Sequence, residues 1–199
     1  MRVRVMAMGL VVSACSVAAM AQMAVGANSG PAAGTIAAPS KAVDSALSLI
    51  EMEMMGAVKA MPAEKFGFAP SAAIFVPSQT TDFATVRTFA QQATHVAQAN
   101  YFFYMTVSGM KPDTDVQGLA KLTKKEDVVA ALAGSFAFAH KAIATLTPAN
   151  AFEVVTIPEP GFYTRATLAQ FGIAHANDHY GQIVEYLRMN GIVPPASAK

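Results

Sequence analysis

Two histidines, His175 and His179, stand four residues apart in the stretch His-Ala-Asn-Asp-His-Tyr-Gly-Gln that spans 175–182. In a helix, side chains four apart lie on one face, and two imidazoles at this spacing can share one metal ion. A third histidine, His95, lies in another segment of helical periodicity, between turns rich in Ala and Gln. Because zinc and similar divalent ions accept neutral imidazole nitrogen, we predict one metal site formed by these three residues.

The alternative is that His175 and His179 are ordinary helix residues. Two features favour the metal site: the pair continues the apolar face of its segment, and His95 has small neighbours. Buried imidazoles also need polar partners, and the chain offers few carboxylates at core positions to pair with them. Three histidines plus a water are the usual form of an open catalytic zinc site.

Other polar residues surround this motif. Asp178 is a candidate general base, or an acceptor for the outer nitrogen of a ligating imidazole, and the alternative is a solvated helix charge. Gln182 follows His179 by three and is a candidate to contact the site from outside the ligand set. The fourth histidine, His140, lies beside an apolar stripe, and we interpret it as structural.

The elements that must position these residues follow from apolar residues recurring at intervals of three and four. We expect helices over 40–61, from 81 or 82 to 108, 124–146 and 164–190. Thr123 and Glu126 match a capping box for the third helix, and Thr164 suits the N-cap of the fourth. With at most a brief strand near 154–157, the predicted fold class is all-α, an antiparallel four-helix bundle.

The N-terminus predicts a cleaved signal peptide over 1–21, with Arg2 and Arg4 followed by the short apolar run 10–20. An alternative is a lipoprotein anchored through Cys15, because 12–15 resembles a lipoprotein box. Either reading predicts an exported, periplasmic protein. We expect a flexible linker over 22–39, a helical domain over 40–195, and no transmembrane helix in the mature chain.

Charge argues against nucleic acid as a partner. Removing Arg2 and Arg4 from the 14 basic residues leaves 12 against 13 acidic ones, a formal charge of −1 without a basic run. The sequence also contains no Gly-rich phosphate loop, nucleophile elbow or His-Glu-x-x-His signature.

The chain resembles the DinB-like (DinB/YfiT-like) family of four-helix-bundle proteins over roughly 40–195. The resemblance rests on Phe-Ala-Pro at 68–70, Arg-Thr-Phe at 87–89 leading to His95, Asn-Tyr-Phe-Phe at 100–103 with Gly109, and above all the 175–182 motif followed by Tyr-Leu-Arg at 186–188 and Gly191. The family implies a four-helix bundle with a long crossover, often dimeric. It also implies a divalent metal, commonly nickel or zinc, held by residues at the positions of His95, His175 and His179.

Two functional hypotheses remain open. The first is a metal-dependent enzyme acting on a small-molecule substrate, of the hydrolase or thiol-transferase type that some family members resemble. Export counts against a cytosolic thiol as cosubstrate. The second is a non-catalytic periplasmic metal-binding or stress-related bundle. A weaker idea is an interaction module that uses the Phe-rich segment 66–75. Substrate, metal identity and a possible homodimer are not readable from the sequence.

Overall fold

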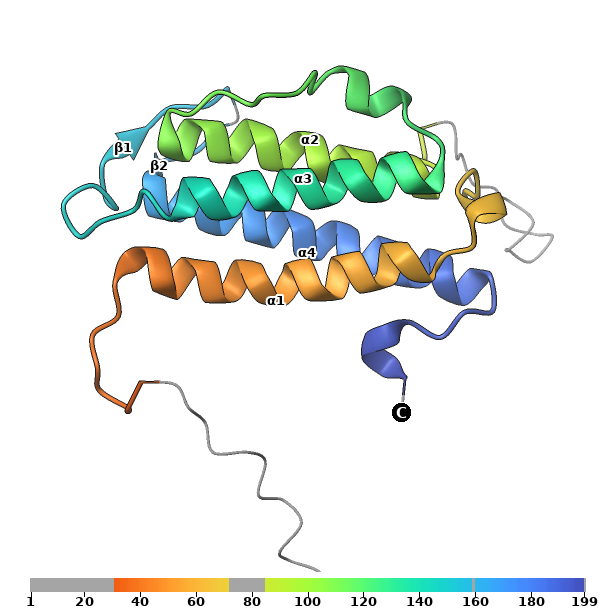
Figure 1. The fold of residues 1–199 in the computed structure, drawn as a ribbon, viewed down its shortest axis with the longest axis horizontal. Coiled ribbons are helices and arrows are strands. Elements are labelled where there is room, and N and C mark those ends of the chain that lie inside the picture. Colours follow the sequence, from red (N-terminus) through yellow and green to blue (C-terminus); the bar gives the residue numbers. More distant parts are fainter. Residues whose placement is uncertain (1–30, 72–84, 159, 199) are drawn as a thin grey trace, which may run out of the picture. The chain divides into compact units, whose positions relative to one another are not determined.

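The computed structural model describes residues 31–71, 85–158 and 160–198, and the predicted signal peptide lies outside these ranges. Residues 31–36 contain only a turn, and the helical unit follows them. Within the described residues it contains four long helices, which confirms the all-α prediction (Figure 1): α1 (Pro39–Ala60), α2 (Phe89–Ser108), α3 (Lys125–Ile143) and α4 (Arg165–Met189).

The helices form a bundle in which α1 contacts α3 and α4, and α2 contacts the same two helices. The pairs α1–α3 and α2–α4 run antiparallel as predicted, whereas α2 and α3 run parallel, as do α1 and α4 (Figure 1). The parallel α2–α3 pair is possible because the connection 109–124 travels back along the bundle before α3 begins. When fully extended, the connection 109–124 is longer than the ~30 Å of a 20-residue helix, so it can span the bundle from one end to the other.

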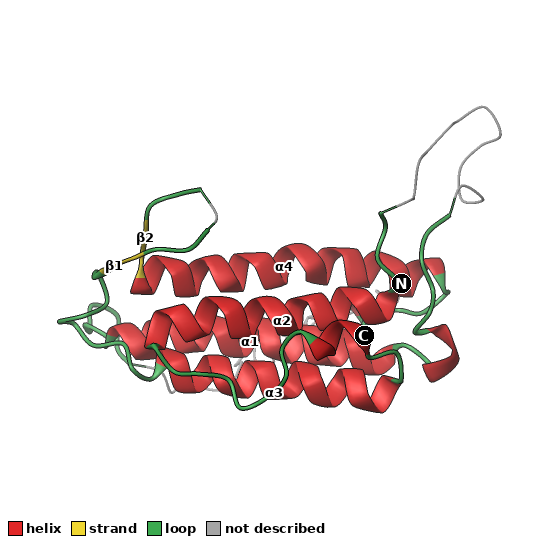
Figure 2. Cartoon of the chain, turned by 90° about the horizontal axis from the view of Figure 1, so that it is seen from above, coloured by secondary structure: helices red, strands yellow, loops and turns green. Residues whose placement is uncertain are grey.

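Short elements complete the connections. The crossover contains the 3-10 turn η4 (Gly118–Lys121), η2 (Ala63–Lys65) follows α1, and η5 (Pro195–Ser197) lies near the C-terminus. The strands β1 (Val154–Val155) and β2 (Tyr163–Thr164) pair antiparallel beside the first turn of α4 (Figure 2). None of the described helices combines the length and the apolar character needed to cross a membrane.

The core follows the predicted apolar stripes. In α1 the buried side chains include Leu47, Ile50, Met54 and Val58, which recur at the spacing of one helix face. From the Phe-rich segment, Phe66 is buried against Phe89 and so is part of the core. The rest of that segment beyond residue 71 lies outside the described residues.

The predicted start of the second helix was too early. Residues 85–88 are not helical, and α2 begins at Phe89 with a capping box between Thr88 and Gln91. The backbone N–H groups of Phe89 and Ala90 donate to the carbonyl oxygens of Phe68 and Phe66, at 2.8 and 2.9 Å. These tertiary hydrogen bonds satisfy the open N–H groups of the first turn, so the helix starts where the loop after α1 meets it.

The predicted capping box of Thr123 and Glu126 does not form. The N-cap of α3 is Lys124, without a side-chain cap, so Thr123 stands one residue too early. The next residue, Lys125, donates from Nζ to the carbonyl oxygens of Lys59 and Met61, both at 2.8 Å, and thereby ties the start of α3 to the end of α1. By contrast, Thr164 caps α4 as predicted, and Gly109 ends α2 at a φ of 75°.

Candidate metal centre

The three predicted histidines come together between α2 and α4. Each of His95, His175 and His179 offers a ring nitrogen, and these three nitrogens lie within 4.8 Å of one another. Ring centroids are 4.5 Å apart for the pair on α4, and 5.1 and 4.7 Å from His95 to His175 and His179. The convergence is consistent with antiparallel packing of α2 on α4, because His95 lies in the first half of α2 whereas His175 and His179 lie at and beyond the middle of α4.

The three imidazoles are held in the neutral form. Burial, then the charges of Arg87 and His175, lowers the pKa of His95 from 6.5 to about 4. Burial is also the main cause for His175 and His179, whose pKa values are each lowered to about 4 although the nearby Asp178 carboxylate acts in the opposite direction. Neutral imidazole is the form that binds a metal ion, so the cluster needs little or no deprotonation near neutral pH.

A chain of amides fixes the orientation of His179. The Asp178 carboxylate can only accept, so Gln182 donates to it from Nε2 at 3.0 Å and presents Oε1 to Gln92. Gln92 donates from Nε2 to that oxygen at 2.7 Å, which leaves its own Oε1 to accept from Nδ1 of His179, also at 2.7 Å. With its proton on Nδ1, His179 carries its free lone pair on Nε2, and that atom is its candidate metal ligand.

The residues fit a divalent metal ion. Three neutral imidazoles are a donor set that borderline divalent cations accept. In addition, Nδ1 of His175 is buried and has no hydrogen-bond partner among the described residues. A buried polar nitrogen without a partner is costly, and a cation or a ligand at the cluster would remove that cost.

Two cavities reach the cluster at His95. One has a volume of about 520 Å³ and is lined by His95 and His175 together with aromatic side chains. The other, of about 600 Å³, is lined by His95, Arg87 and polar side chains. Both volumes suit small-molecule ligands, and His95 and Gln98 belong to both cavities.

The residues expected around the histidines have different positions. Gln182 accepts a hydrogen bond from Gln92, which in turn accepts from His179, so it is linked to the cluster through one intermediate residue. Asp178 is exposed and lines neither cavity that reaches His95, so its predicted role as a general base remains a prediction. Sequence reasoning gave no role to Gln92 or Arg87. The sequence feature that could have indicated a role for Gln92 is its position three residues before His95, which places both side chains on the same helix face.

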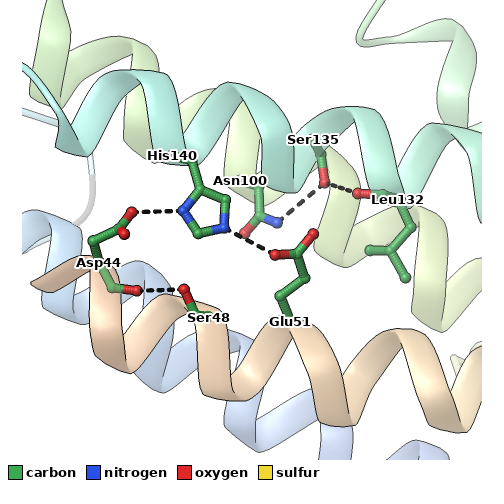
Figure 3. A network of polar contacts seen from close by, with 7 residues as sticks. All are labelled: Asp44, Ser48, Glu51, Asn100, Leu132, Ser135 and His140. Atoms are coloured by element: carbon green, nitrogen blue, oxygen red, sulfur yellow. Dashed lines mark hydrogen bonds and ion pairs between the residues drawn. The ribbon is translucent and has the colours of Figure 1, made fainter. Parts of the chain in front are cut away.

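His140 is structural, as interpreted from the sequence. It lies on α3 and is not one of the three clustered histidines. It bridges two carboxylates of α1 (Figure 3). Its Nδ1 is 2.6 Å from Asp44 Oδ1 and its Nε2 is 2.9 Å from Glu51 Oε2. Burial lowers the pKa of His140, but the hydrogen bonds and charges of both carboxylates outweigh this effect, so that the pKa is raised overall.

Fold and site together define a helical-bundle protein with a three-histidine cluster that could hold a metal ion. Residues 46–183, which contain all three histidines, match the DinB superfamily. Because this match covers more than half of the sequence, the chain belongs to the DinB superfamily. No curated protein sequence matches the chain significantly.

Among solved structures, the chain is similar to the crystal structure of a DinB-like protein from Bacillus cereus ATCC 10987. The TM-score is 0.63 at 12% sequence identity, and the match covers 78% of this chain and 95% of that one. At this identity the likeness shows the shared fold.

Proposed function

We propose that this DinB-superfamily protein is an exported metal-dependent enzyme that uses His95, His175 and His179 to hold a divalent ion, with zinc or nickel as the first choices. The hydrolase and thiol-transferase types are the reaction classes to test first. One observation carries the proposal: three neutral imidazoles converge at a point that two ligand-sized cavities reach.

A divalent ion bound by three imidazoles supplies a Lewis acid with coordination positions left for a small molecule. The chain's own residues supply the rest. Gln92 holds the His179 ring in one orientation by accepting from its Nδ1. Phe103 packs edge-on against His175, with ring centroids 5.6 Å apart, and gives that side of the cluster an apolar neighbour. Burial is the main cause of the low pKa values of the three histidines, and the positive charge of Arg87 lowers them further. The same charge favours an anionic ligand.

Metal analysis of the purified full-length protein, grown in medium supplemented with zinc or nickel, tests the proposal. We expect one divalent ion per chain in the wild type and substoichiometric metal in H95A. The matched control is H140A, which removes a histidine outside the cluster and should retain the metal. Circular dichroism of each variant separates loss of the site from loss of the fold.

Catalysis is tested on the same preparations by comparing metal-loaded protein with chelator-treated protein. Activated esters report hydrolysis, and a chromogenic electrophile with a small thiol reports thiol transfer. Turnover that disappears with the metal and returns on reloading supports the enzyme. A bound metal without turnover of any of these substrates favours the alternative, a non-catalytic metal-binding bundle. A wild-type protein that binds no divalent ion contradicts both.

Export is the second part of the proposal. It is supported by the basic start, the apolar run over 10–20 and the small residues before position 22. Fractionation of cells that express the full chain, followed by mass determination of the mature protein, tests it. We expect a periplasmic product beginning at Gln22, whereas a lipid-modified product beginning at Cys15 supports the lipoprotein alternative. An unprocessed protein in the cytoplasm contradicts export.

A further inference from the structure

The two cavities that meet at His95 differ in chemistry. The 520 Å³ cavity has walls of aromatic and aliphatic side chains, among them Phe102, Phe103 and Phe171. The 600 Å³ cavity is lined by hydroxyl, amide and guanidinium groups, among them Gln91, Thr94 and Arg87. A single molecule that enters both cavities must therefore have one apolar part and one polar part.

The aromatic wall is continuous with the histidine cluster. Phe171 packs edge-on against Phe103 at a centroid distance of 5.2 Å, and Phe103 packs in the same way against His175 at 5.6 Å. Phe171 is 37% exposed, so it stands at the rim of this wall, whereas Phe103 is buried. An apolar group that covers Phe171 and Phe103 would remove apolar surface from water and would lie directly beside His175.

The charge of the other cavity is positive. Arg87 is the one permanently charged side chain among the described residues that line either cavity, and none of these lining residues is an Asp or a Glu. Arg87 and His95 line the same cavity, so the guanidinium group borders the space that leads to the histidine cluster. Because no carboxylate is found among the described lining residues, the guanidinium group is available to an anion with two oxygens in a plane.

We infer that the substrate of this site is a small amphipathic organic anion. Its aromatic or branched apolar body lies against Phe103 and Phe171, its carboxylate faces Arg87, and the group that reacts lies between them at His95. This inference rests on the proposed metal-dependent function, because it places the reacting group at the histidine cluster. It adds the class of molecule that the two cavities select.

Calorimetric binding of three probes to the metal-loaded protein tests the inference. Hydrocinnamate carries both parts, hydrocinnamamide replaces the charge with a neutral amide, and acetate lacks the apolar body. We expect hydrocinnamate to bind at least about tenfold more tightly than either of the others. Equal affinity for the acid and the amide, or no saturable binding of hydrocinnamate, would overturn the inference.

Two variants assign the parts of the molecule to the two cavities. R87Q should remove the preference for the acid over the amide while leaving the affinity for the amide unchanged, and F171A should weaken both aromatic probes. The matched controls are R188Q and F152A, because Arg188 and Phe152 are exposed and line neither cavity. If R87Q still prefers the acid over the amide, the metal site alone recognises the carboxylate. That result would overturn the role given to Arg87.

Measuring metal content on the same samples keeps this test separate from the proposed function. If the protein binds its metal but not the probes as described, the substrate class is wrong and the metal site stands. If the protein holds no metal yet discriminates the probes as described, the metal-dependent function is wrong and the cavities still select an amphipathic anion.

Discussion

Gln92 Oε1 lies 2.7 Å from Nδ1 of His179, across the interface between α2 and α4. The contact is buried, since Gln92 is 3% exposed and His179 is 6% exposed. An outer hydrogen bond of this kind fixes which ring nitrogen is available to a metal ion, and its loss typically lowers metal affinity by about 10–100-fold. Gln92 is therefore as much a part of the candidate site as the histidines that it touches.

The first prediction concerns this residue. We expect Q92A to bind the divalent ion about 10–100-fold more weakly than the wild type, measured by competition with a chromophoric chelator. The control Q92E keeps an acceptor for the Nδ1 proton but loses the donor to Gln182, so it should retain more affinity than Q92A. An unchanged affinity in Q92A would show that His179 does not depend on this hydrogen bond.

A second prediction separates two roles of Asp178. Its carboxylate ends the amide chain through Gln182, so we expect D178N to lower metal affinity less than Q92A does and to keep turnover within about tenfold. A general base behaves differently, because its removal slows turnover by about 10²–10⁴-fold without changing the affinity for the metal. Measuring kcat and the metal Kd on the same preparation distinguishes the two results.

The parts of this site that could be predicted are those set by one helix at a time. The spacing of His175 and His179 fixes a common face, and His95 lies on a segment whose periodicity shows which side is buried. The role of Gln92 depends on the register of α2 against α4, and that of Arg87 on how the residues just before α2 pack. No single-helix pattern contains this information. The same limit explains the missed start of α2 and the absent capping box of α3, where contacts with Phe66, Phe68 and the end of α1 decide the outcome.

The third prediction is a loss of stability on acidification that arises from the metal-site histidines. Their pKa values are lowered to about 4 in the folded protein, against 6.5 as the ordinary value. Between these values the unfolded chain takes up protons that the folded chain does not, so the stability of the metal-free protein should fall as pH falls from about 6.5 towards 4. We expect the unfolding free energy, measured by urea denaturation across this pH range, to change less with pH in H95A than in the wild type. Identical pH dependence in both proteins would argue against the lowered pKa of His95.

His140 is predicted to have the opposite pH dependence. Its pKa is raised in the folded state by Asp44 and Glu51, which outweigh the effect of burial. A raised pKa stabilises the fold fully below the ordinary value of 6.5, and this contribution is lost as pH rises through the folded-state value. We therefore expect the difference in unfolding free energy between the wild type and H140Q to be largest in mild acid and to shrink at alkaline pH. The comparison with H140Q cancels the titration of the other groups, and a difference that grows with pH would contradict the raised pKa.

The last prediction tests the packing that holds α4 in register with α2. A Cβ added at Gly172 would lie 3.0 Å from the hydroxyl oxygen and 3.1 Å from Cζ of Tyr104, whose ring is fully buried. Tyr104 donates its hydroxyl to the carbonyl oxygen of Ala169 at 3.1 Å, so the ring cannot move without disturbing that hydrogen bond. We expect G172A to lower the unfolding free energy by about 1–3 kcal/mol in chemical denaturation. The matched control is G181A in the same helix, where an added Cβ meets nothing within 4 Å and should stabilise the helix by about 0.5–1 kcal/mol. Equal stabilisation of both variants would contradict this prediction. It would show that the close approach of α4 to Tyr104 does not restrict how α4 packs on α2.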